Sequence, residues 1–235
     1  MDRFKVNNKS SQLIVLQRIE IAGFFIKKLR KILGRYFFTN IISKFFLSKL
    51  NVGKRYFEVM SKEFLMISKE IESPEYKNFL SIGSGLGGLE VLINNKIGPK
   101  NFCFIERNFT SKKVRYGWGG TTNSEAYNNI LEQKKFLLEN NIDDKNIHIF
   151  DYDKDKDQFP KLKFDVIISL LSMDYHYDFS LYEKYLKNVS TENTKIIFDT
   201  VRPDYFKKVF KNIKILDIKN DTVHKSKRLL CSGFI

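Results

Sequence analysis

Apolar residues recur along the chain at two different spacings, and the spacing changes at Pro74. Before it, apolar positions step by three and four, first from Ala22 to Leu33 and again from Phe57 to Ile71. Lysines fall on the opposite side of the first stripe, so the pattern predicts two amphipathic helices, the first of them basic. Such stripes usually pack on the protein's own core, although a membrane surface or a partner could also cover them.

After Pro74, short apolar runs alternate with helical stretches, which is typical of βαβ units in an α/β fold. The predicted strands are 79–82, 102–105, 147–150, 164–171, 195–199, 213–218 and 228–234. The predicted helices are 86–95, 124–140, 181–189 and 205–211. We therefore predict a basic helical extension, residues 1–74, followed by one catalytic α/β domain, residues 75–235.

Positive charge is concentrated near the N-terminus. Of the formal net charge of +14, residues 1–56 carry +11, from 13 Lys and Arg against Asp2 and Glu20. This segment could meet a nucleic acid, an anionic membrane surface or a phosphorylated substrate, or it could be a solvated helix face. No run supplies the roughly 20 apolar residues of a membrane span, and no secretory signal is evident. We expect a protein that is cytoplasmic, either free or peripheral to the membrane, with Cys103 and Cys231 as buried thiols in strands.

A glycine-rich turn follows the first predicted strand, in the stretch NFLSIGSGLGGLEV from Asn78 to Val91. Gly83, Gly85 and Gly88 satisfy the G-x-G-x-x-G of a dinucleotide-binding turn. Gly83, Gly85 and Gly87 instead satisfy the G-x-G-x-G typical of S-adenosylmethionine-dependent methyltransferases. In either case the glycines let a strand turn sharply into a helix, so that a ligand lies against bare backbone.

An acidic residue, Glu106, ends the second predicted strand, 18 residues after Gly88. Its carboxylate could accept hydrogen bonds from both hydroxyls of a ribose, or it could be a surface carboxylate paired with Arg107. Both cofactors contain a ribose, so Glu106 does not choose between them. The architecture does, because one seven-stranded sheet uses all residues after the turn and leaves no separate substrate domain of the kind that hydride-transfer enzymes usually add.

Four segments resemble the first, second, fourth and fifth strand motifs of class I S-adenosylmethionine-dependent methyltransferases: FLSIGSGLGGLEV, FCFIERN, FDVIISLLS and KIIFDTVR. The resemblance covers about residues 75 to 235. It implies a Rossmann-like sheet of strand order 3-2-1-4-5-7-6 with the seventh strand antiparallel, and S-adenosylmethionine as the cofactor. The implied cofactor-binding residues are Gly83, Ser84, Gly85, Gly87, Glu106, Asp151 and Ser169. Among them Asp151, or its neighbour Asp153, would meet the adenine amino group.

More narrowly, the segments SMDYHYDFSLYEKYL and DTVR are similar to those of sugar O-methyltransferases. The sequence differs from that pattern at Met173 and Asp178, where Trp and Pro are common, which leaves the acceptor class open. His176 follows a central strand, at the edge where open α/β sheets bind ligands, and is the candidate general base. A histidine between tyrosines is, however, often only a packing residue. The candidate substrate-binding residues are Trp118, which is either on a lid or in an ordinary glycine-rich loop, Asp174, Tyr175 and Tyr177.

These features favour methylation of a hydroxyl on a sugar or another small metabolite. Two alternatives stay open: an RNA methyltransferase that grips phosphates with its basic N-terminal residues, and a catalytically silent binding protein. No metal site is predicted. The run DYDKDKDQFPKL starts like a calcium loop but has Lys156 in place of Gly and Leu162 in place of Glu, and no Cys/His pair has zinc-ligand spacing.

Overall fold

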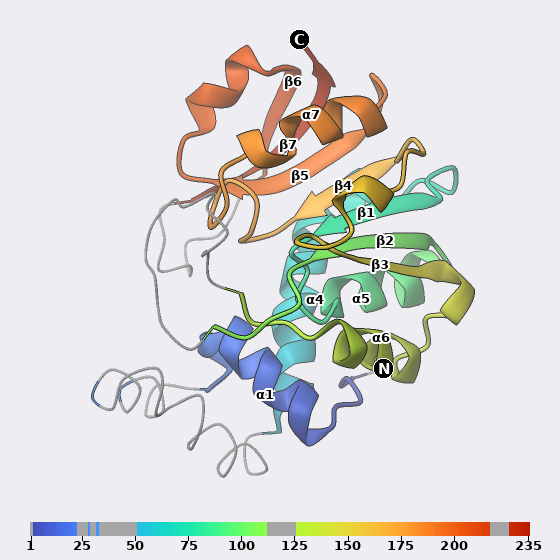
Figure 1. Ribbon diagram of the computed structural model, residues 1–235, viewed down its shortest axis with the longest axis vertical. Helices are drawn as coiled ribbons and strands as arrows, with labels where there is room; N and C mark the ends of the chain where they lie inside the picture. Colours follow the sequence, from blue (N-terminus) through green and yellow to red (C-terminus); the bar gives the residue numbers. More distant parts are fainter. Residues whose placement is uncertain (1, 23–27, 29–31, 33–50, 112–125, 217–225) are drawn as a thin grey trace.

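The computed structural model describes residues 2–22, 28, 32, 51–111, 126–216 and 226–235. Its centre is a seven-stranded sheet of order β3-β2-β1-β4-β5-β7-β6 (Figure 1). The strands are β1 (Asn78–Ile82), β2 (Asn101–Glu106), β3 (Ile147–Asp151), β4 (Val166–Ser169), β5 (Lys195–Thr200), β6 (Phe210–Leu216) and β7 (Lys227–Phe234). Strands β1 to β5 pair in parallel, whereas β7 runs antiparallel to both β5 and β6. The predicted fold class, including the strand order and the antiparallel seventh strand, is confirmed.

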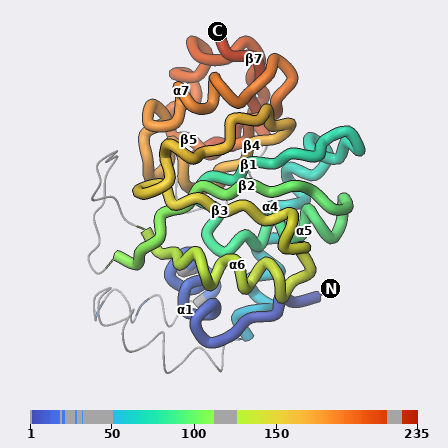
Figure 2. The backbone as a smooth tube through the Cα atoms, turned by 45° about the vertical axis from the view of Figure 1, so that its right-hand side comes forward, coloured from blue at the N-terminus to red at the C-terminus, as the bar shows by residue number. Residues whose placement is uncertain are grey.

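Helices cover both faces of this sheet. They are α1 (Asn8–Gln17), α4 (Val52–Ile71), α5 (Gly88–Ile97), α6 (Ile130–Glu139) and α7 (Ser180–Val189), with short 3-10 turns η1 (Ile19–Ala22), η4 (Asp144–Asn146), η5 (Lys156–Gln158) and η6 (Pro203–Lys208). One apolar cluster joins α1, α4, α5 and α6 to one sheet face, and a second joins α7 and η6 to the other. Figure 2 shows α1 lying beside α6 on the first of these faces. None of the helices in the described part of the chain is long and apolar enough to span a membrane.

The N-terminal helices pack on the core of the sheet. The apolar stripe of α4 is buried in the same cluster as β1 and α5, at Met60, Phe64, Ile67 and Ile71. Helix α1 begins with a capping box, in which the Asn7 side chain accepts from the backbone of Ser10 while Ser10 Oγ accepts from the Asn7 backbone. The second predicted apolar stripe therefore packs on the protein's own core. The first stripe, Ala22 to Leu33, lies almost wholly outside the described residues.

The predicted elements differ from the structure in two places. The helix predicted over 124–140 begins only at Ile130, since the described residues 126–129 are not helical, and the chain also differs after β5. The predicted helix 205–211 is a short 3-10 turn, η6, and β6 starts at Phe210, not at residue 213. The reason is that Phe206 and Phe210 both insert into the aromatic cluster beneath α7, which fixes where the chain turns. Strand β6 lies at the sheet edge and exposes Lys211 and Lys214, so its alternation of apolar and polar residues is weak.

Both cysteines are buried, as the sequence predicts. Cys103 lies in β2 and Cys231 in β7, and neither forms a disulfide. Burial raises the pKa of each thiol to about 12, so both stay protonated and unreactive at neutral pH.

Candidate functional site

The glycine turn joins β1 to α5 at the carboxyl edge of the central strand. Gly83, Gly85 and Gly87 have φ of +67°, +68° and +83°, in the left-handed region that favours glycine. Gly88 does not share this conformation: it begins α5, and its amide donates to Tyr56 Oη at 3.2 Å. The backbone does not by itself choose between the two overlapping motifs, because the third glycine of a dinucleotide-binding turn serves close packing, and a Cβ atom on Gly88 would overlap the Tyr56 side chain.

Glu106, at the end of β2, reaches under this turn. Its Oε1 accepts from Ser84 Oγ at 2.8 Å and from the Gly85 amide at 3.1 Å. Burial raises the pKa of the Glu106 carboxyl to about 8, even though the hydrogen bond from Ser84 acts in the opposite direction. The neighbouring Arg107 guanidinium binds both oxygens of Asp153 at 2.9 Å. Glu106 itself is buried, so the alternative of a surface carboxylate is wrong.

The end of β3 lies next to Glu106. Asp151 is the register partner of Glu106 and is buried, and its Oδ1 accepts from the Asp153 amide at 3.1 Å. The Arg107 guanidinium lies 5.8 Å from the ring centre of Tyr177 and 6.0 Å from that of Tyr152. A cluster of rings and charges thus flanks the Glu106 carboxylate, on the side where the resemblance implies the adenine.

Ser169, at the end of β4, is committed to the protein's own backbone. Its hydroxyl donates to the Ile82 carbonyl at 2.8 Å and accepts from the Met173 amide at 2.9 Å. It is buried, and its bonds tie the end of β1 to the end of β4. This geometry supports a role in holding the two strand ends beside the glycine turn, and its contact with a cofactor stays a prediction.

The loop after β4 contains two non-glycine residues in the left-handed region, Leu171 at φ 54° and Asp174 at φ 58°. Such conformations persist only where the surroundings hold them. The Leu171 amide donates to Asp199 Oδ2 at 3.0 Å, and the fully buried Asp174 carboxylate accepts from Thr200 Oγ1 and from Arg202. The bonds of Asp174 thus favour a structural role in this loop, and its predicted contact with a substrate remains untested.

The same loop places three predicted residues in different surroundings. Burial raises the pKa of Tyr177 to about 12, and the charged groups that act on it are Arg107, Glu106 and Asp153. Burial also raises the pKa of Tyr175 to about 12, and the charged groups that act on it are Asp199, Arg18 and Glu20. His176 is exposed between them, with its ring centre 4.8 Å from that of Tyr175. Trp118, the fourth candidate for the substrate, lies outside the described residues.

Several residues at the turn carry no signal in the sequence. Gln17, the last residue of α1, donates from Nε2 to the Tyr127 carbonyl at 2.6 Å, and its Oε1 would overlap a Cβ atom placed on Gly85. Glu90, in the first turn of α5, is buried and accepts from Ser81 Oγ, while its Oε2 has no hydrogen-bond partner in the described structure. Burial raises the pKa of Glu90 to about 7. For Glu90, the one clue in the sequence is its position in the first turn of the helix that follows the glycine turn.

A buried ion network lies behind the loop after β4. Arg228 of β7 donates to both oxygens of Asp199, at 2.9 and 3.0 Å, and to Glu63 of α4. Arg18 Nη1 lies 3.7 Å from the other oxygen of Glu63. The network therefore connects the N-terminal helices to the strands that carry the candidate site.

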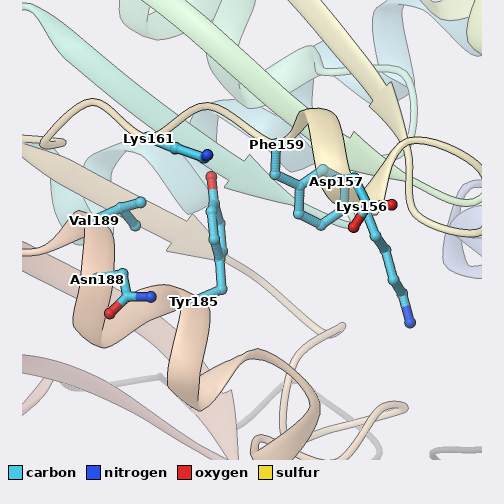
Figure 3. Close-up of a pocket in the computed structure, with 7 residues that line it drawn as sticks. All are labelled: Lys156, Asp157, Phe159, Lys161, Tyr185, Asn188 and Val189. Atoms are coloured by element: carbon cyan, nitrogen blue, oxygen red, sulfur yellow. The ribbon is translucent and has the colours of Figure 1, made fainter.

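A pocket of about 260 Å³ lies elsewhere, between the η5 region and α7 (Figure 3). It is lined by Lys156, Asp157, Phe159, Lys161, Tyr185, Asn188 and Val189. None of these belongs to the glycine turn or to the loop after β4, and the Tyr185 hydroxyl donates to the Pro160 carbonyl at 3.0 Å. None of the predicted cofactor-binding, substrate-binding or catalytic residues that the structure describes lines this pocket.

No family model matches the chain, and no curated protein is detectably similar to it. Solved structures with a similar fold include magnesium protoporphyrin IX methyltransferase (ChlM) from Synechocystis PCC 6803 with bound SAM, at 12% identity, covering 97% of this chain and 98% of that chain with a TM-score of 0.47. Precorrin-6y C5,15-methyltransferase from Geobacter metallireducens shares 12% identity over 74% of this chain and 87% of that chain, with a TM-score of 0.45. The B. subtilis M1A22 tRNA methyltransferase TrmK shares 14% identity over 73% of this chain and 65% of that chain, also with a TM-score of 0.45. At TM-scores below 0.5, these likenesses do not bear on the cofactor or the acceptor of this chain.

Proposed function

We propose that the chain is an S-adenosylmethionine-dependent methyltransferase. The observation that carries the proposal is the pairing of the glycine turn with Glu106. Two left-handed glycines, Gly83 and Gly85, are partly exposed at the carboxyl edge of the central strand, and a buried carboxylate lies 3.1 Å from the amide of Gly85. This is the arrangement that a nucleoside with a free ribose requires, because backbone can approach the ligand while the carboxylate accepts from its hydroxyls.

The residues present fit this cofactor. Ser84 and Gly85 are partly exposed at the turn, so a ligand can reach the backbone there, and Glu106 would accept from the ribose hydroxyls. Asp151 would accept from the adenine amino group, with Arg107 and Tyr177 beside the base. Ser169 would act by holding the strand ends in place.

We further propose that the acceptor is a small hydroxylated molecule such as a sugar. When bound, S-adenosylmethionine supplies a methyl group on a positively charged sulfur, and the acceptor oxygen attacks that carbon in line with the leaving sulfur. His176 is exposed at the carboxyl edge of the sheet, where it would take the proton of the acceptor hydroxyl. Tyr175, on the side of Arg18, would contact the acceptor ring.

The experiment is methyl incorporation from labelled S-adenosylmethionine into separate pools of sugars and nucleotide sugars, other small metabolites, and total RNA. We expect label in a hydroxylated small molecule, and a Glu106→Gln variant assayed in parallel should lose most of that label. Label in RNA alone would replace the proposed acceptor. No label in any pool, from a protein that still binds S-adenosylmethionine, would favour a catalytically silent binding protein.

A further inference from the structure

The end of helix α1 covers the glycine turn. Gln17 is anchored there by its bond to the Tyr127 carbonyl, and its amide lies over the Cα of Gly85. Arg18 caps α1, with its own amide donating to the Ile14 carbonyl at 2.8 Å. These contacts fix the position of the Arg18 backbone beside the turn, although 65 residues separate it from Gly83 in the sequence.

The Arg18 side chain is only 15% exposed, yet among the residues that the structure describes its guanidinium has only long ion pairs. In the described part of the chain its two ion pairs are 3.6 Å, to Glu20, and 3.7 Å, to Glu63, and both exceed hydrogen-bonding distance. Glu63 already accepts a hydrogen bond from Arg228, and the Glu20 side chain is 44% exposed. Because arginine has five N–H donors in a fixed fork, this geometry leaves it able to bind a carboxylate with two hydrogen bonds.

The charge of Arg18 acts on both parts of the candidate site. Burial raises the pKa of Tyr56, whose hydroxyl accepts from the Gly88 amide, and Arg18 opposes that rise. Arg18 also lowers the pKa of Glu90 in the first turn of α5, against the larger effect of burial, and that of Tyr175 in the loop after β4. The guanidinium is therefore close enough to act electrostatically on both the glycine turn and the loop after β4.

We propose that Arg18 binds the carboxylate at the aminoacyl end of the cofactor, an inference that rests on the proposed function. The ribose, bound at Glu106, has the adenine on the side of Arg107 and Asp151, so the aminoacyl end extends the other way, toward α1. The cationic amino group of the same end then has Glu20 and Glu63 as nearby carboxylates. Arginine suits this position better than lysine, because its planar fork matches a carboxylate.

The test compares two ligands by calorimetry. S-adenosylhomocysteine has the aminoacyl end, whereas 5′-methylthioadenosine has the same nucleoside and sulfur without it. For Arg18→Met we expect about ten-fold or greater loss of affinity for S-adenosylhomocysteine and an unchanged affinity for 5′-methylthioadenosine. Arg18→Lys should recover part of the loss. Lys9→Met, which removes an exposed cation from the same helix, should change neither affinity.

Two results would overturn the inference. One is an Arg18→Met variant that binds S-adenosylhomocysteine as tightly as the wild type. The other is an equal loss for both ligands, which would mean that Arg18 only supports the fold of the site. In either case the wild type still binds the nucleoside, so the proposed function stands; a wild type that binds neither ligand would instead contradict the proposed function itself.

Discussion

Two buried carboxylates, Glu90 and Glu106, lie beside the glycine turn in surroundings that favour their neutral forms. Burial is the largest cause for both, and it raises their pKa values to about 7 and about 8. The charge of Glu90 also raises the pKa of Glu106. A ligand that brings hydroxyl donors or positive charge to this place would stabilise the ionised forms, so binding and ionisation should be coupled.

Glu106 should therefore make cofactor binding depend on pH. A carboxylate accepts hydrogen bonds from two ribose hydroxyls best when it is ionised, so affinity for S-adenosylhomocysteine should rise as the pH increases from 6 to about 8 and then level off. Glu106→Gln should bind about ten-fold or more weakly and should lose this rise. Calorimetry at several pH values measures both effects. A rise of equal size in the variant would assign the dependence to Glu90.

Glu90 should make the folded protein less stable as the pH rises, whereas Glu106 should make cofactor binding tighter. Its pKa is raised from 4.5 to about 7 in the folded protein, so its contribution is present below pH 4.5 and is lost as the pH rises through 7. The contribution is at most about 3 kcal/mol. In thermal unfolding of the ligand-free protein, Glu90→Gln should reduce the loss of stability between pH 5 and pH 8. An unchanged loss would show that Glu90 ionises without cost.

His176 should govern acceptor turnover without affecting cofactor affinity. General-base assistance contributes roughly 10²- to 10⁴-fold, so His176→Ala should lower turnover by about that factor. The activity of the wild type should rise through the pH range in which histidines lose a proton, and the variant should lack that rise. Turnover and a pH profile like those of the wild type would mean that the acceptor proton leaves by another route.

At the scale of elements, helix α1 both supports the core and forms part of the site. It buries Leu13, Ile14, Val15 and Leu16 in the cluster that includes α4 and α5, and it ends at Gln17 over Gly85. The loop after β4 is held in a comparable way, because its Leu171 amide donates to Asp199 and its Asp174 carboxylate accepts from Arg202. Both segments that border the candidate site are thus positioned by contacts from elements distant in sequence.

The contribution of α1 to stability can be tested at Ile14, whose side chain is fully buried. Ile14→Ala should lower the free energy of unfolding by about 2 to 5 kcal/mol, because it removes apolar contacts and leaves a cavity. The matched control is Leu131→Ala on α6, where the leucine is 77% exposed and the change should be within about 0.5 kcal/mol. Urea unfolding of both variants measures this, and equal small effects would mean that α1 is not part of the folded core.

At the scale of the whole molecule, the sequence was most informative where local spacing decides structure. The alternation of apolar runs and helical stretches, with the resemblance, predicted the sheet and its order, and the turn at Gly83 lies where the motif predicted it. The edge strand β6 was misjudged because solvent covers one of its sides, and its spacing is correspondingly weak. Gln17 and Arg18 could not be found at all, since only tertiary packing brings α1 to the turn.

The account depends most directly on which nucleotide the glycine turn binds. Calorimetric titration of the wild-type protein with S-adenosylhomocysteine and, separately, with NAD compares the two meanings of the overlapping glycine motif. The strand order β3-β2-β1-β4-β5-β7-β6, with β7 antiparallel, differs from the 3-2-1-4-5-6 order of the dinucleotide-binding fold, and it predicts binding of S-adenosylhomocysteine and no measurable binding of NAD. Tighter binding of NAD would contradict the proposed cofactor and the function built on it.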